Sequence, residues 1–239
     1  GLAFAPIIFY GWLNIGILLG VAFGVVIFLL GTFVCRKLAN GITANICRTL
    51  FDELEPEQAL KQLKSELSSK TATEWSFFAA MMVSQAYQAM GEFKEAEQVL
   101  ITFLNKADEG KSNIEAMSWL VTLYTTADKP ESALNAYKKI ESGISGRTLT
   151  ESEKMSVETA RSNSLLAAGT PEECLDYFKS ESNTQRGNLR YIVMSFRLAE
   201  VYDALGKAED AENEYRTVAE KGKDLYVAQK ARQRLAQMQ

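Results

Sequence analysis

Apolar and polar residues follow two different patterns along this chain, and the change between them falls near residue 38. Residues 7–34 contain no charged side chain, and this stretch is longer than the roughly 20 apolar residues that cross the core of a bilayer. All Lys, Arg, Asp and Glu residues come after Cys35, and apolar positions there recur with the spacing of amphipathic helices. The pattern predicts an all-α chain in which a single transmembrane helix within residues 1–38 precedes a helical domain.

Glycines form one face of the predicted transmembrane helix. Gly16, Gly20 and Gly24 are four residues apart, and Gly31 lies near the continuation of the same face. Small residues let a second transmembrane helix approach closely, and a polar amide such as that of Asn14 can bond across the contact. Besides membrane lipid, we therefore expect this helix to contact transmembrane helices of other subunits or of its own copies.

The flanks of the apolar stretch indicate an orientation in the membrane. Arg36, Lys37 and Arg48 follow it, whereas the residues before it are neutral. The positive-inside rule then places the C-terminal domain in the cytoplasm. The sequence starts at Gly1 and not at Met, and basic residues preceding it would remove or reverse this bias. The periplasm or another non-cytoplasmic side is the alternative.

Four segments after residue 73 share one pattern, and each predicts a helix, a tight turn and a second helix. The turn position favours a residue that adopts positive φ, and a small residue five positions later lets the two helices cross closely. A large residue follows four positions after that. The turn residues are Gly91, Asp128, Gly169 and Gly206, the small residues are Ala96, Ala133, Cys174 and Ala211, and the large residues are Leu100, Tyr137, Phe178 and Tyr215.

This pattern resembles the tetratricopeptide repeat, whose 34-residue unit carries tyrosine, glycine, alanine and an aromatic residue at these spacings. The small residues here lie 37, 41 and 37 positions apart, and Leu165 replaces the expected tyrosine of the third copy. The resemblance covers residues 74–225 and implies an α-solenoid of four helical hairpins. The pattern also predicts a degenerate first repeat within residues 39–73, around Ala59, and a capping helix within residues 226–239.

The resemblance also implies a binding surface. Solenoids of this family bind protein segments in a groove lined by the first helix of each repeat, so a protein or peptide partner is expected there. A solvated groove without a ligand is the alternative. By the family's register the groove residues are Met81, Gln85, Gln88, Ser118, Thr122, Thr125, Thr159, Asn163, Phe196, Glu200 and Asp203.

Composition argues against several other classes of function. The chain has 26 basic and 30 acidic residues, so nothing favours nucleic acid as a partner. It contains no histidine, the commonest general base and metal ligand, and its three cysteines form no CxxC motif. We expect no catalytic residues, no cofactor and no metal site.

Two hypotheses for function follow from these observations. The first is a membrane-anchored interaction scaffold, or an accessory subunit of a multi-subunit membrane complex, that recruits a partner through its helical repeats. The alternative is a homo-oligomeric membrane ring or pore, in which copies of the glycine helix assemble and the solenoids form a soluble skirt.

Overall fold

The computed structural model describes residues 41–68, 76–106, 111–184 and 187–238, and every regular element in these ranges is helical. The prediction of an all-α fold is therefore confirmed. Two compact units are divided after Asn45, and the second, residues 46–239, is the one described below. Within the described ranges, no helix combines the length and the apolar character needed to cross a membrane. The predicted span at residues 7–34 lies outside these ranges.

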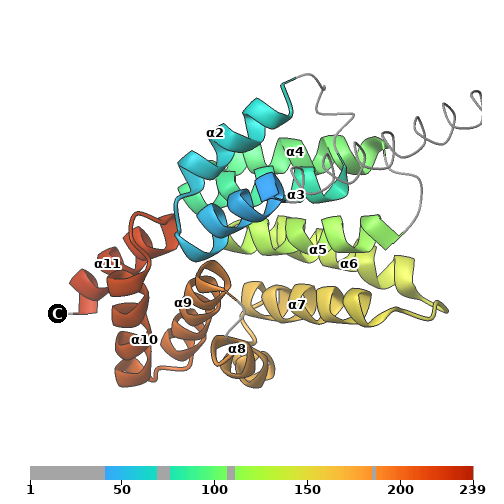
Figure 1. The fold of residues 1–239 in the computed structure, drawn as a ribbon. Coiled ribbons are helices and arrows are strands. Elements are labelled where there is room, and N and C mark those ends of the chain that lie inside the picture. The colour runs from blue at the N-terminus through green and yellow to red at the C-terminus, as the bar shows by residue number, and fades with distance from the viewer. Residues whose placement is uncertain (1–40, 69–75, 107–110, 185–186, 239) are drawn as a thin grey trace, which may run out of the picture. The chain divides into compact units, whose positions relative to one another are not determined.

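Most helices of the second unit follow one another as pairs joined by tight turns (Figure 1). The unit begins with a π-helical turn, η1, and later contains a 3-10 turn, η3, between α7 and α8. In chain order the elements are η1 (Arg48–Asp52), α2 (Pro56–Glu66), α3 (Phe77–Met90), α4 (Phe93–Lys106), α5 (Lys111–Thr126), α6 (Pro130–Ile144), α7 (Glu151–Ala167), η3 (Pro171–Glu173), α8 (Leu175–Ser182), α9 (Asn188–Ala204), α10 (Ala208–Lys221) and α11 (Tyr226–Met238).

The turns between paired helices place one residue in the left-handed conformation. The φ angles are 83° at Gly91, 55° at Asp128, 76° at Gly169 and 70° at Gly206. Glycine adopts this conformation freely, and aspartate is among the few other residues that visit it routinely. Leu54, one repeat interval before Gly91, also has a φ of 55°, although this conformation costs an L-residue about 1–2 kcal/mol.

Small residues lie where the two helices of a pair cross. Ala59, Ala96, Ala133, Cys174 and Ala211 are all 0% exposed. A larger side chain at these positions would force the helices apart, because side chains at the contact set the distance between helix axes. In the pairs α3–α4, α5–α6 and α9–α10 the second helix packs closely on the first, whereas α8 packs mainly on α9.

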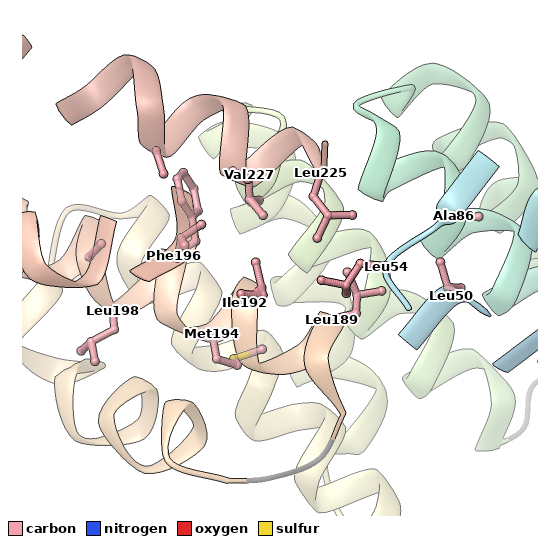
Figure 2. Packing of buried hydrophobic residues seen from close by; sticks show 14 of the residues in the cluster. Leu50, Leu54, Ala86, Leu189, Ile192, Met194, Phe196, Leu198, Leu225 and Val227 are labelled. Carbon is pink, nitrogen blue, oxygen red and sulfur yellow. The ribbon is translucent and has the colours of Figure 1, made fainter. Parts of the chain in front are cut away.

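The two ends of the unit meet in one hydrophobic cluster. Leu50 and Leu54, from the first turn, belong to the same buried cluster as Leu189 of α9 and Leu225, which precedes α11 (Figure 2). Polar contacts surround it: Asn188 Nδ2 donates to the carbonyl oxygen of Asp52 at 2.7 Å, and Lys223 Nζ donates to that of Glu53. The beginning of the unit is therefore packed against α9 and against the segment that leads into α11.

The last helix also reaches the turn between α3 and α4. The ring of Tyr226 packs edge-on against Phe93, with ring centroids 4.8 Å apart. A Cβ atom built on Gly91 would lie 2.6 Å from Cδ2 of Tyr226. Glycine is therefore required at position 91 both by its positive φ and by the closeness of α11.

Two glycine substitutions measure this contact. Gly91→Ala and Gly206→Ala both place a side chain on left-handed backbone, at a cost of about 1–2 kcal/mol, but open space surrounds Gly206. We expect Gly91→Ala to lower the free energy of unfolding by at least about 1 kcal/mol more than Gly206→Ala, because it also overpacks against Tyr226. Urea denaturation followed by circular dichroism measures both. Equal losses would mean that α11 does not pack on this turn.

Candidate functional site

The first helices of four successive helix pairs line one cavity of about 410 Å³. Side chains of α3, α5, α7 and α9 form most of its wall, and Phe51 of η1 completes it together with Leu225 and Val227 at the start of α11. Its volume lies within the roughly 300–1,000 Å³ of small-molecule sites. Since η1 and α11 come from opposite ends of the unit, this wall depends on the contact between the two ends.

The structure brings together some of the predicted groove residues and separates others. Five of them line the cavity: Gln85, Gln88, Ser118, Thr122 and Thr159. Three others, Phe196, Glu200 and Asp203, line a second hollow of about 450 Å³ between α9, α10 and α11. The final helix contributes to both hollows: Val227 lines the first, and Arg234 lines the second, where Arg234 Nε donates to Asp203 Oδ2 at 2.7 Å.

Three predicted groove residues line neither hollow. Met81 and Thr125 are half-buried, and Thr125 Oγ1 donates to the carbonyl oxygen of Val121 at 2.9 Å. Asn163 is 0% exposed, and its Nδ2 donates to the carbonyl oxygen of Thr159 at 2.8 Å. Asn163 therefore presents no surface to a partner in this structure.

The residues predicted to contact other transmembrane helices lie outside the residues that the structure describes. They are Asn14, Gly16, Gly20, Gly24 and Gly31.

Several residues of the cavity wall were not predicted. Met155 lies one helical turn before Thr159 in α7, so the same 3.6-residue period could have identified it. Phe51, Leu225 and Val227 had no such signal, because they reach the cavity through the contact between the chain's two ends. Repeat periodicity describes neighbouring units and carries no information about that contact.

A buried arginine connects three of the helices around the cavity. Arg197 of α9 is 1% exposed, its Nη1 donates to Glu200 Oε2 at 2.5 Å, and its Nη2 donates to Thr126 Oγ1. Thr126 Oγ1 also accepts a hydrogen bond from Gln88 Nε2 at 2.9 Å. Since Gln88 and Thr126 line the cavity, this network ties α3, α5 and α9 together at its wall.

The surroundings of Glu200 shift the pKa of its carboxyl group in two opposite directions. Burial raises its pKa, while the positive charge and hydrogen bond of Arg197 lower it, and the net direction is upward. A group whose pKa is raised by folding contributes stability that is present below its unfolded pKa and lost as pH rises through its folded pKa. Without Arg197, the cost of the charged carboxylate at neutral pH would be larger.

Comparison with protein-family models found no match, and a search of curated proteins likewise found none. In the ranges that the structure describes, no group of three or more His, Cys, Asp or Glu side chains is arranged to hold a metal ion. The cavity itself is therefore the site whose chemistry can be argued from the residues.

The arginine network gives a test by stability and pH. We expect Arg197→Met to lower the free energy of unfolding by about 3 kcal/mol at neutral pH, the low end for a broken buried pair, because the Glu200 side chain is 32% exposed. This loss of stability should be smaller at a pH near the ordinary carboxyl pKa, because Glu200 takes up a proton there. Urea denaturation of both proteins at about pH 7.5 and about pH 4.5 measures it.

The matched variant is Glu200→Gln, which keeps an acceptor for Arg197 but leaves its guanidinium, 2% exposed, without a charged partner, so it should also cost about 3 kcal/mol. The double variant should lose less free energy of unfolding than the sum of the two single losses, because neither charged group is left without its partner. A pH-independent loss for Arg197→Met, or strict additivity, would show that the ion pair is not coupled as described.

Proposed function

We propose that this chain is a membrane-anchored protein–protein interaction scaffold or an accessory subunit of a multi-subunit membrane complex. In this proposal a single-pass helix docks against transmembrane helices of other subunits through the face of Gly16, Gly20 and Gly24. The tetratricopeptide-like helical pairs, on the cytoplasmic side, recruit a protein partner. The chain then acts by contact and not by catalysis.

One observation carries the proposal: four first helices from successive pairs contribute side chains to the wall of one cavity. That is the surface on which a repeat array presents several units to one partner at once. Met155, which lies in the wall, is 47% exposed, so part of the rim is accessible from outside. Positive φ at the turns and fully buried small residues at the crossings also agree with a repeating hairpin architecture.

The electrostatics of the cavity also favour contact over acid–base chemistry. Among the residues that the structure describes, Arg190 is the one charged residue lining this wall, and Arg190 Nε donates to Glu181 Oε2 at 3.1 Å. An ion-paired guanidinium neither accepts nor releases a proton near neutral pH. The wall therefore supplies no pair of groups suited to general acid–base catalysis.

A pull-down with two matched variants tests the partner surface. Met155 and Ile101 are both exposed apolar residues, 47% and 38%, but Ile101 lies on α4 outside the cavity wall. After gentle extraction from membranes, we expect Met155→Lys to lower partner recovery at least tenfold and Ile101→Lys to leave it unchanged. The opposite result would place the partner on the outer face. Recovery of the wild-type chain as a lone monomer would contradict the scaffold proposal itself.

Cross-linking separates the two modes of membrane assembly. With Gly20→Cys, an accessory subunit should give a discrete band containing a different protein, because its helix faces another subunit. A homo-oligomeric ring would give a ladder of multiples of this chain. The control is a cysteine on the opposite face of the predicted helix, Ala22→Cys, which should cross-link less in both cases because two residues along a helix correspond to a rotation of roughly 200°.

A further inference from the structure

The cavity wall contains many serine and threonine residues, yet few of their hydroxyl protons are free. In α5, Ser118 Oγ donates to the Ile114 carbonyl oxygen at 2.8 Å, and Thr122 Oγ1 donates to that of Ser118 at 3.2 Å. Thr126 Oγ1 likewise donates to the Thr122 carbonyl oxygen at 2.7 Å. A hydroxyl has one proton, so a group that donates to its own helix has none left for a ligand.

The same holds on the opposite wall. Ser152 Oγ donates to Glu115 Oε1 at 2.6 Å. Thr159 Oγ1 donates to the Met155 carbonyl oxygen at 2.9 Å and lies 2.6 Å from the Tyr177 hydroxyl. Thus five of the six serine and threonine hydroxyls of the wall donate their proton within the protein. These hydroxyls therefore offer a ligand few donors, although their oxygen atoms can still accept a hydrogen bond.

The rest of the wall is mostly apolar, although the amides of Gln85 and Gln88 and the guanidinium of Arg190 also line it. Trp119, Met155, Leu189, Val193 and Met194 face the cavity from three different helices. Methionine side chains adapt to ligands of irregular shape, because they are unbranched and polarisable. The single charge, on Arg190, is balanced by Glu181, whose Oε2 accepts from Arg190 Nε at 3.1 Å. Neither an anion nor a cation finds an unpaired opposite charge here.

These properties select the kind of molecule that fits. Each residue of an extended peptide brings a backbone N–H and a C=O group, and burying such groups without partners costs roughly 1–3 kcal/mol apiece. An apolar chain has no such groups and gains roughly 25 cal/mol for each Å² removed from water. An engineered apolar cavity of about 150 Å³ already binds benzene, and this cavity is larger, at about 410 Å³.

We propose that the cavity binds an uncharged, single-chain apolar small molecule that carries at most one hydroxyl group. The bound chain lies between α5, α7 and α9, with Phe51 and Leu225 completing the enclosure. The two proposals share this wall: a protein partner would contact the exposed rim at Met155, while the apolar molecule occupies the interior.

The test uses 1-decanol as the probe and Trp119 as the reporter. The chain has three tryptophans, and the background Trp12→Phe/Trp75→Phe leaves only Trp119, in the cavity wall. The full chain is placed in phospholipid nanodiscs free of alkyl detergent, with empty nanodiscs as the blank. We expect 1-decanol to change Trp119 emission saturably. The diol 1,10-decanediol should bind at least tenfold more weakly because both ends are polar, and decanoate at least tenfold more weakly at neutral pH because it is charged.

Three further substitutions in this background locate the site. Val193→Phe fills the cavity and should weaken 1-decanol binding at least tenfold, while Ile101→Phe, outside the wall, should leave it unchanged. Thr122→Val removes a hydroxyl that bonds its own helix and should change affinity less than twofold. Circular dichroism checks that each variant is folded.

If Val193→Phe does not fold, the comparison of 1-decanol, 1,10-decanediol and decanoate on the protein with an unchanged cavity wall still decides the test. The proposal is overturned if 1-decanol gives no saturable change, if the diol or decanoate binds equally well, or if Thr122→Val loses affinity tenfold. The assay contains no protein partner, so such a failure leaves the scaffold proposal untouched, and a failed pull-down leaves this one untouched.

Discussion

The contact between the two ends of the helical unit is the constraint on which the rest of the structure depends. Leu50 and Leu54 share a buried cluster with Leu189 and Leu225, and backbone carbonyl oxygens of the first turn accept hydrogen bonds from Asn188 and Lys223. An open array of hairpins would leave its first and last apolar faces in water. Here each end covers the other, and the space between the first helices becomes a partly open cavity with walls from both ends of the unit.

Side-chain chemistry then determines the character of that cavity. Threonines and serines on α5 and α7 use their hydroxyls on carbonyl oxygens and neighbouring side chains, while Arg197 draws Thr126 and Gln88 into a buried network. Polar residues thus stabilise the wall without making its surface polar. The same residue types, left unbonded, would have made a wet groove suited to peptide backbone.

Sequence periodicity predicted the turns and the helix-crossing residues but not the contact between the two ends of the unit, and the reason is physical. The turn residues from Gly91 to Gly206 and the crossing residues from Ala96 to Ala211 follow from short-range rules, because each depends on a helix and its immediate successor. The register of the resembled family predicted Gln85, Thr122 and Thr159 as groove residues, and they line the cavity. The second set, Phe196, Glu200 and Asp203, lines a different hollow that α11 helps to form. No pattern within one repeat shows where that helix packs.

The closure between the ends also bears on how the unit folds. Asp52 and Asn188 are bonded across 136 residues of sequence, whereas most helix contacts in an open repeat array involve neighbours. Open arrays can form at any point and propagate unit by unit, but an array with joined ends must close a long loop before its last contacts form. Loss of either end therefore affects helices far away in the sequence, and unfolding should behave as one cooperative event and not as gradual fraying from a terminus.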